Sequence, residues 1–384
     1  MRILQVHNHY RQAGGEDAVV FAEAALLRAA GHEVFQHQVD NPDRALAASR
    51  KMAVSAWNPS AARDVRSFAE AHRPDVAHVH NTWYALSPAV IHALKQAGVP
   101  VVMTLHNYRL LCANGLLFRD GHPCRDCVGT HPWHGVLHRC YRGSAVASTA
   151  AAAAIAINQA RGTWARDVDL FLALSEFAKS QFVAGGIPHS MIEVKPNFVN
   201  DPGPRARPPS ESGTLLYVGR LSLEKGVDRL IELSRSLERA GLELLVVGDG
   251  PMRQALSARQ TDAVRLLGPL PGQAIARLMS EARALIFPSI WYEGQPVVIL
   301  EAFAAGLPVL GSDLGGISEL LAPLGNEWLV DSPLRAERWD TAIAGLLDDD
   351  HVDEAGRRVR ETFEARFHPA AALSLLEATY RSII

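Results

Sequence analysis

Basic residues are not in excess in this sequence, and long hydrophobic runs are missing from it. Lysine and arginine total 38 of the 384 residues against 41 aspartates and glutamates, which gives a net charge of −3. Domains that bind nucleic acid usually carry a strongly basic face. The composition therefore argues against nucleic acid as a partner.

The longest apolar stretch is too short to cross a bilayer. It reads SAVASTAAAAAIAI, whereas a membrane-spanning helix needs about 20 apolar residues. Residues 1–6 enter a strand-like stretch without the charged and apolar leader of a signal peptide. We therefore expect a cytoplasmic protein. Peripheral contact of residues 145–156 with the inner face of a membrane is left open, although a core helix is the preferred interpretation.

The sequence does contain a regular alternation of short apolar runs with helical patterns. Within one helical pattern, Val20, Ala24 and Leu27 fall on a single stripe. Such alternation predicts parallel sheets covered by helices on both faces. The predicted strands are residues 2–6, 33–39, 76–80, 99–105 and 170–174 in the first half, and 214–218, 242–247, 264–267, 284–287 and 308–310 in the second.

A proline-rich segment divides this alternation into two halves. Residues 196–213 hold five prolines and two glycines, and proline continues neither a helix nor a central strand. We predict an α/β protein with a first domain over residues 1–197 and a second over residues 198–368. Ligands of parallel sheets bind beyond the carboxyl ends of the strands. The predicted site is therefore the cleft between two facing sheets.

The first chemical motif, GRLSLEKG, follows a predicted strand of the second half. Gly219 lets the chain turn, and Arg220 and Lys225 lie in the loop after it. Two cations in this place suit a diphosphate, because a guanidinium can bind two oxygens at once. The alternative is a solvated loop with a surface ion pair to Glu224.

The second chemical motif reads PSIWYEGQPVVILEAF. Pro296 suits the first turn of a helix, and the backbone N–H groups around Gln295 and Val297 form a ready anion site. Glu293 lies in the loop before this helix, and Glu301 lies among apolar residues within it. A carboxylate there needs a partner. Sugar hydroxyls would serve, and the alternative is a buried salt bridge to a core arginine.

Together with VVGDGP and AAGLPVLGSDLGGISE, these motifs resemble the carboxyl half of the retaining glycosyltransferases of family 4. The E-x7-E spacing of Glu293 and Glu301 matches that family. The resemblance covers much of the second half closely and the rest of the chain in outline. It implies the GT-B architecture, in which two Rossmann-like domains face each other and the last helix, here residues 369–384, packs back on the first domain.

The resemblance also implies roles for individual residues. Arg220 and Lys225 would hold the donor diphosphate, Glu301 the ribose hydroxyls and Glu293 the hydroxyls of the transferred sugar. The backbone near Leu270 would meet the base. The other donor-binding candidates are Gly219, Gly294, Gln295, Pro296 and Val297.

Further candidates lie in the first half. Gly14 and Gly15 open the first predicted helix, where the backbone can approach a ligand closely. They do not form the G-x-G-x-x-G fingerprint, which argues against a dehydrogenase. By resemblance, His106 contacts the donor sugar, and His80 is a candidate on the acceptor side.

All four cysteines, Cys112, Cys124, Cys127 and Cys140, lie in one segment. The C-x2-C pair within it has the spacing of zinc ligands, and histidines surround it. A structural Zn²⁺ would hold together a long loop that lacks a helix or strand pattern. The alternatives are four reduced thiols, or disulfides, which the lack of a secretion signal disfavours.

The predicted function is that of a metal-independent glycosyltransferase of the hexosyltransferase type. The cations and the helix end would stabilise the departing phosphate, and the D-x-D pattern of Asp167 and Asp169 is interpreted as flanking a strand. The donor is a nucleotide diphosphate sugar. The acceptor, which could be lipid-linked, belongs to polysaccharide, glycolipid or glycoconjugate biosynthesis. The alternatives are a nucleotide-sugar epimerase or hydrolase, and a non-catalytic nucleotide-sugar-binding protein.

Overall fold

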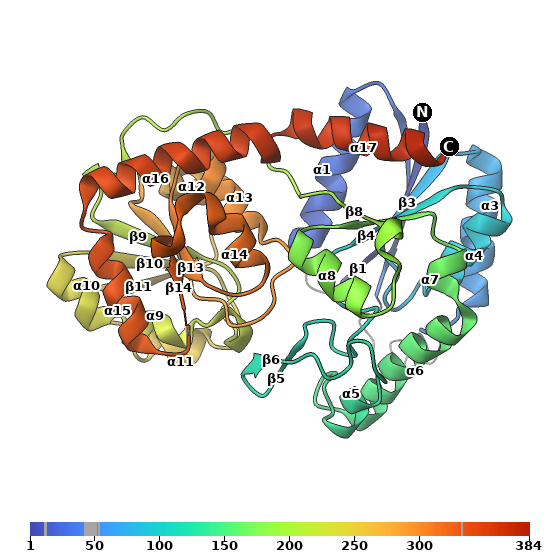
Figure 1. Cartoon of the computed structure of the whole chain (residues 1–384), viewed down its shortest axis with the longest axis horizontal. Helices are drawn as coiled ribbons and strands as arrows, with labels where there is room; N and C mark the ends of the chain where they lie inside the picture. Colours follow the sequence, from blue (N-terminus) through green and yellow to red (C-terminus); the bar gives the residue numbers. More distant parts are fainter. Residues whose placement is uncertain (11–13, 42–51, 53, 332) are drawn as a thin grey trace. The chain divides into compact units, whose positions relative to one another are not determined.

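The computed structural model describes residues 1–10, 14–41, 52, 54–331 and 333–384. The chain divides into two compact units, and Figure 1 labels many of their elements. Unit 1 comprises Met1–Leu117, Cys124–Pro196 and Ala372–Ile384, and unit 2 comprises Phe118–Pro123 and Asn197–Ala371.

Unit 1 is built on a six-stranded parallel sheet with the order β2-β1-β3-β4-β7-β8. Its strands are β1 Arg2–His9, β2 Glu33–Asp40, β3 Val76–Asn81, β4 Val101–Leu105, β7 Leu170–Ala173 and β8 Ile192–Val194. The helices that accompany them are α1 Gly15–Ala29, α3 Pro59–His72, α4 Ala89–Gln96, α5 His134–Leu137, α6 Ala145–Arg161, α7 Thr163–Arg166 and α8 Glu176–Ala184.

The C-terminal helix α17, Pro369–Ile383, contributes to the core of unit 1 through residues beyond 371. Leu376 and Tyr380 are fully buried in a cluster with Ile3 of β1 and Leu27 of α1. The Tyr380 hydroxyl also lies 2.8 Å from Nδ1 of His78 on β3. The C-terminal helix thus stabilises the sheet that contains the N-terminal strand β1.

Unit 2 repeats the plan with a parallel sheet in the order β11-β10-β9-β12-β13-β14. Its strands are β9 Thr214–Val218, β10 Glu243–Val247, β11 Val264–Gly268, β12 Ala284–Phe287, β13 Val309–Ser312 and β14 Leu329–Val330. Its helices are α9 Asp228–Glu232, α10 Ser234–Ala240, α11 Arg253–Ser257, α12 Gly272–Glu281, α13 Val297–Ala304, α14 Gly316–Leu321, α15 Ala336–Gly345 and α16 Asp349–Thr362. A separate two-stranded pair joins β5, Phe118–Arg119, and β6, His122–Pro123.

The predicted α/β fold with two parallel sheets is confirmed. The sequence pattern missed one edge strand in each sheet, because β8 and β14 have only three and two residues and so show no periodicity. Between β9 and β10 the helical segment is divided at Leu233 into α9 and α10.

The proline-rich segment 196–213 is packed against unit 2 along much of its length. The Arg360 guanidinium donates two hydrogen bonds to the Asp201 carboxylate, at 2.6 and 2.7 Å. Arg205 donates to the carbonyls of Gly306 and Ala282. The predicted linker is therefore held in place rather than being a free tether.

The alanine-rich segment forms helix α6, and Ala151 and Ala154 on it pack in a cluster with Trp83. Small side chains allow this close approach, while Val146 near the start of the helix is 82% exposed. None of the helices in the described ranges has both the length and the hydropathy that a membrane crossing requires.

Candidate active site

Loops that follow four neighbouring strands of unit 2 contact one another at the carboxyl edge of its sheet. In the loop after β9, the Glu224 carbonyl accepts a 2.9 Å hydrogen bond from Ile290 N, which lies in the loop after β12. In the same loop, Leu221 N donates a 2.9 Å hydrogen bond to the carbonyl of Asp249, which lies in the loop after β10. Gly248 N in turn donates to Gly268 O at the end of β11. The predicted donor motifs thus form one continuous edge.

Two glycines make this close contact between loops possible. A Cβ atom on Gly226 would lie 1.9 Å from the carbonyl oxygen of Pro288, and one on Gly248 would lie 1.9 Å from that of Gly219. Both glycines also have positive φ, 66° and 141°. Only glycine fits these places without a shift of backbone.

Lys225 and Glu293, one from each motif, form an ion pair in this edge. The Lys225 ammonium donates to Oε1 of Glu293 at 2.6 Å. The same oxygen accepts from the Ser289 hydroxyl and from the Trp291 indole N–H, both at 2.8 Å. Three donors therefore fix the Glu293 carboxylate, and its charge neutralises one of the two predicted phosphate-binding cations.

Arg220 lies in the same loop as Lys225 and is exposed to solvent. Its carbonyl accepts a hydrogen bond from the buried Tyr217 hydroxyl at 2.9 Å, which fixes the backbone of the turn. Within the described ranges its guanidinium has no ion-pair partner. Glu224 instead accepts from the Ser222 hydroxyl at 2.6 Å. The alternative of a surface ion pair with Glu224 is therefore wrong for Arg220.

The exposure of Glu301 and the hydrogen-bond partner of Gln295 were not predicted from the sequence. Glu301 lies on the solvent-exposed side of α13, and partial desolvation by the surrounding protein raises the pKa of its carboxyl group. Since it is exposed, the alternative of a buried salt bridge to a core arginine is wrong. The buried Gln295 side chain accepts a hydrogen bond from Asn197 N at 2.5 Å. Gln295 thus has a structural partner already, at the point where α13 starts after Pro296.

In unit 1, His106 and His80 form a hydrogen-bonded pair at the ends of adjacent strands. His80 Nδ1 and His106 Nε2 are 3.1 Å apart. Burial lowers the pKa of both imidazoles well below 6.5, aided by the positive charge of Lys195. Both rings are therefore neutral at neutral pH, so one donates and the other accepts.

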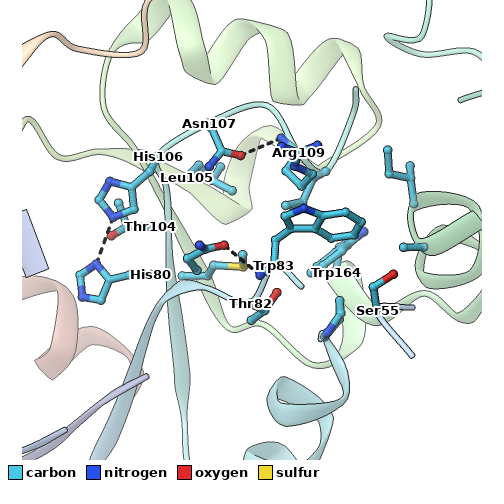
Figure 2. Close-up of a pocket in the computed structure, with 16 residues that line it drawn as sticks. Ser55, His80, Thr82, Trp83, Thr104, Leu105, His106, Asn107, Arg109 and Trp164 are labelled. Carbon is cyan, nitrogen blue, oxygen red and sulfur yellow. Dashed lines mark hydrogen bonds between the residues drawn. The ribbon is translucent and has the colours of Figure 1, made fainter. Parts of the chain in front are cut away.

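A small cavity adjoins the two histidines (Figure 2). Trp83, Asn107 and Arg109 also line it, and Trp83 N–H donates back to the Asn81 carboxamide at 2.9 Å. Its volume of about 40 Å³ admits a few water molecules but not a sugar. His80 and His106 therefore border a space in unit 1 that has room for a few water molecules only.

Comparison with known proteins assigns both halves of the chain to glycosyltransferases. Residues 204–364 match the family model of glycosyl transferases group 1, and residues 13–201 match that of glycosyltransferase family 4. The chain belongs to the group 1 and family 4 glycosyltransferases that these two models describe. The resemblance on which the sequence interpretation rests is confirmed.

Individual relatives of this glycosyltransferase are distant. It is 31% identical over 177 residues to the alpha-D-kanosaminyltransferase of Streptomyces kanamyceticus, covering 44% of this chain and 45% of the relative. It is 28% identical over 216 residues to a putative colanic acid biosynthesis glycosyltransferase of Escherichia coli, covering 52% and 53%. The chain thus spans about half the length of these relatives.

Solved structures share the fold of the glycosyltransferase over its whole length. The Anabaena protein HepE in complex with UDP-glucose matches with a TM-score of 0.68 at 17% identity, covering all of both chains. A sucrose-phosphate synthase from Thermosynechococcus elongatus matches with a TM-score of 0.70 at 18% identity, covering 99% and 98%. At this identity the likeness supports the GT-B fold alone.

The glycosyltransferase also contains a buried charged network that the sequence interpretation missed. Glu23 of α1 and Lys195, which follows β8, are fully buried and form an ion pair. The second oxygen of Glu23 lies 3.6 Å from both His78 and His80. A signal was present, because Glu23 sits directly beside the apolar stripe of α1, where a charge needs a buried partner.

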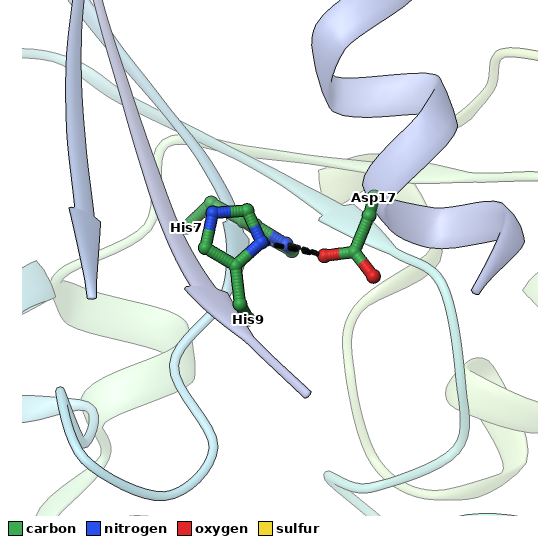
Figure 3. Close-up of side chains that lie close together, drawn as sticks. All are labelled: His7, His9 and Asp17. Atoms are coloured by element: carbon green, nitrogen blue, oxygen red, sulfur yellow. Dashed lines mark hydrogen bonds and ion pairs between the residues drawn. The ribbon is translucent and has the colours of Figure 1, made fainter. Parts of the chain in front are cut away.

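A second cluster fixes the end of β1 against the start of α1 (Figure 3). Oδ1 of Asp17 lies 2.9 Å from His7 Nε2 and 2.7 Å from His9 Nδ1, and Oδ2 accepts from Gly14 N at 2.9 Å. Burial acts to raise the pKa of Asp17, but these hydrogen bonds outweigh it and lower the pKa. Gly14 and Gly15 are exposed beside this cluster, and a Cβ on Gly14 would meet open space.

The D-x-D pattern has structural partners in the glycosyltransferase. Asp169 pairs with Lys95 and accepts from Val101 N at 2.8 Å, while Asp167 lies 3.1 Å from His92 Nδ1. Both carboxylates precede β7 and so lie at the amino end of the sheet. They connect β7 to α4 and β4.

Proposed function

We propose that the protein transfers a sugar from a nucleotide diphosphate sugar to an acceptor hydroxyl and retains the anomeric configuration. The observation that carries the proposal is the shared edge of unit 2, where Arg220, the Lys225–Glu293 pair and the start of α13 come from contacting loops. Cations and carboxylates in one place suit a ligand that has both phosphates and hydroxyls. Fold alone would not support an activity.

In the proposed reaction, the bond between the anomeric carbon and the phosphate oxygen breaks as the acceptor oxygen bonds to that carbon. The departing diphosphate takes the proton of the acceptor hydroxyl. Arg220 and Lys225 stabilise the negative charge that develops on the leaving group, and the backbone N–H groups at the start of α13 add to this. These groups supply the charge for which other enzymes use a divalent metal ion, so we propose metal-independent transfer.

The carboxylates are assigned to hydroxyl groups. Glu293 is held by three donors and buried, so it can accept from the transferred sugar without rearrangement. Glu301 is exposed on α13 and is assigned to the ribose. Leu270, Gly219 and Gly294 supply close backbone around the donor. In unit 1, the neutral His106 is assigned to the sugar, and unit 1 is assigned to the acceptor.

The pathway is proposed from the relatives. One relative bears the name of a putative colanic acid biosynthesis protein, another that of a putative teichuronic acid biosynthesis protein of Bacillus subtilis, and a solved structure with this fold holds UDP-glucose. We therefore propose a hexosyl transfer in polysaccharide or glycoconjugate biosynthesis, at or near the inner face of a membrane when the acceptor is lipid-linked.

The decisive experiment measures donor binding and transfer together. Nucleoside diphosphates are screened for thermal stabilisation, and the matching nucleotide sugars are then incubated with and without acceptors. We expect stabilisation by one diphosphate, its loss in Arg220→Ala but not in the control Arg277→Ala, and transfer that depends on an acceptor. Rapid conversion of donor alone would indicate an epimerase or hydrolase. Donor binding without transfer to any acceptor would indicate a binding protein.

A further inference from the structure

Potential metal ligands gather in two groups within the described ranges, and neither group contains a cysteine. The zinc site expected from the C-x2-C spacing therefore stays a prediction. One of the two groups holds Glu23, His78 and His80, all of them buried. Its negative charge is already balanced, because the Lys195 ammonium pairs with Glu23. The group is therefore a hydrogen-bonding network rather than a site for a second cation.

Two buried polar atoms of this network face each other without a hydrogen bond. Oε2 of Glu23 lies 3.6 Å from Nε2 of His80, and neither atom has a hydrogen-bond partner among the described residues. Oε2 lies equally far from Nδ1 of His78. Both nitrogens of that ring already meet hydroxyls, however, Nδ1 that of Tyr380 at 2.8 Å and Nε2 that of Thr104 at 2.7 Å. The second carboxylate oxygen is therefore left to His80.

The charge of Glu23 decides which nitrogen of His80 carries the hydrogen. A carboxylate only accepts hydrogen bonds, so it repels a bare ring nitrogen and attracts an N–H. Burial lowers the pKa of His80 well below 6.5, and a neutral imidazole has a single N–H. Lys195 donates to the other oxygen of Glu23, and within the described ranges no hydrogen bond joins it to Nε2 of His80. His80 therefore carries its hydrogen on Nε2 and accepts at Nδ1.

His106 then takes the opposite role at the contact between the two rings. Its Nε2 lies 3.1 Å from Nδ1 of His80 (Figure 2), and since that atom of His80 accepts, Nε2 of His106 donates. Burial also lowers the pKa of His106, so its ring is neutral and no hydrogen is left for Nδ1. His106 is the more exposed of the two residues. The nitrogen that it can offer to a ligand is thus an acceptor.

We propose that Glu23 and His80 are positioning residues that fix the tautomer of His106, so that its Nδ1 accepts a hydrogen bond from a hydroxyl of the transferred sugar. The identity of this ligand rests on the proposed function, which assigns His106 to the sugar. The tautomer itself rests on unit 1 alone. A bare Nδ1 requires a donor in the ligand, so a hydroxyl fits, whereas a fluorine or a phosphate oxygen does not.

The first test determines the tautomer and needs no activity. The full-length protein is labelled with ¹⁵N-histidine, and a long-range proton–nitrogen correlation spectrum at neutral pH distinguishes ring nitrogens with and without hydrogen. His106→Gln assigns the signals of that ring by their loss. The control His189→Gln, at an exposed histidine, should leave them in place. We expect hydrogen on Nε2 of His106 and none on Nδ1. Hydrogen on Nδ1, or a charged ring, would overturn the proposal.

Two variants at His80 separate positioning from packing. His80→Asn retains a side-chain oxygen that can accept from Nε2 of His106, whereas His80→Leu fills the space without an acceptor. We expect His106 to keep its tautomer in His80→Asn and to show both tautomers in His80→Leu. Thermal unfolding reports whether each variant folds, and the wild-type spectrum is decisive if one does not. An unchanged tautomer in folded His80→Leu would contradict the role of His80.

A double variant tests the part of Glu23. Glu23→Leu combined with Lys195→Met removes both charges of the buried pair, so that neither is left without a partner. Without the carboxylate, His80 has no reason to keep its hydrogen on Nε2, and both tautomers of His106 should appear. A folded double variant in which His106 keeps the wild-type tautomer would show that Glu23 does not set it.

The last test identifies the role of His106 toward the sugar. Calorimetric titration compares the nucleotide sugar selected by the donor screen with its deoxy and deoxyfluoro analogues. Affinity is measured rather than rate, because fluorine itself slows cleavage of the bond to phosphate. At one position both analogues should bind roughly three- to tenfold more weakly, and His106→Ala should abolish this difference while the control His189→Ala retains it.

The outcomes of this titration are distinct. A fluoro analogue that binds like the parent at the position where the deoxy analogue is weak would show that His106 donates, which overturns the proposal. The absence of any position that depends on His106 would overturn its contact with the sugar. If no nucleotide sugar binds at all, the proposed function fails, whereas the tautomer found in the first test still decides whether Glu23 and His80 act on His106.

Discussion

The Lys225 ammonium donates a 2.6 Å hydrogen bond to Glu293, whose residue is only 5% exposed. The two residues come from motifs 68 positions apart in the chain. In the proposed reaction this pair places a cation next to the departing phosphate and a fixed carboxylate next to the sugar. In that proposal, the pair would couple the binding of the donor to the reaction.

The first prediction concerns the cation of this pair. Lys225→Ala should lower kcat/KM by about 100- to 1,000-fold, because one preorganised charge is lost from the leaving group. Unfolding free energy should fall by about 1–3 kcal/mol, since Glu293 loses one of its donors in a buried place. Steady-state kinetics and denaturant unfolding measure the two effects.

A matched control is Lys95→Ala, which removes the partner of Asp169 at the amino end of the sheet in unit 1. That variant should turn over like the wild type and lose at most about 1 kcal/mol of stability. Wild-type turnover in the Lys225 variant would contradict the assignment of Lys225 to the departing phosphate.

The second prediction concerns Glu301 and the ribose. The wild type should bind its nucleoside diphosphate more tightly than it binds the nucleotide analogue that lacks the 2′- and 3′-hydroxyls. We expect a difference of about 1.5–3 kcal/mol in binding free energy. Glu301→Ala should bind both forms alike, at the weaker affinity. Calorimetric titration gives the four affinities, and Glu281→Ala, an exposed glutamate on α12, is the control. A ribose preference that survives in Glu301→Ala would place the hydroxyl contact elsewhere.

The third prediction separates loop contact from backbone strain. Gly226 and Gly241 have nearly the same φ, 66° and 67°. A Cβ on Gly241 meets nothing within 4 Å, whereas one on Gly226 meets the Pro288 carbonyl. Gly241→Ala should therefore cost about 1 kcal/mol, and Gly226→Ala about 1–3 kcal/mol more with a loss of donor binding. Equal melting temperatures for the two variants would show that the loops do not need this contact.

The fourth prediction is a pH dependence of stability from Glu16 in the first turn of α1. Burial, followed by the nearby Asp17 charge, raises the pKa of Glu16 from 4.5 to about 8. Between these values the unfolded chain has released the proton that the folded chain still holds. Stability from this group is thus lost as the pH rises from about 4.5 to 8, by at most about 1.4 kcal/mol per pH unit.

Glu16→Gln removes this titration. Its melting temperature relative to the wild type should rise steadily from pH 5 to pH 8, as measured by thermal unfolding in one buffer series. The control Glu70→Gln alters an exposed helical glutamate and should run parallel to the wild type. A constant difference between Glu16→Gln and the wild type across this range would show that Glu16 titrates normally.

Much of the fold could be predicted because its signals are local. Apolar runs such as 170–174 are long enough to form a buried strand, and Pro296 directly before an apolar run marks the start of α13. The same reasoning pointed to the cysteine segment and to the motifs that are assigned to the donor. It could not show that Glu301 is exposed, because its neighbours in the chain are apolar and its exposure depends on which face of α13 packs on the sheet.

The order of residues along the chain was thus sufficient for two parallel sheets, for their loops at the carboxyl edge and for membership of the glycosyltransferase family, since periodicity and motif spacing are properties of neighbouring positions. Only folding in three dimensions decided that Lys225 pairs with Glu293, that Lys195 neutralises Glu23, and that Gln295 is bound to Asn197. These contacts join residues far apart in the chain, and their formation depends on the packing of side chains at a sheet edge, which no local pattern encodes.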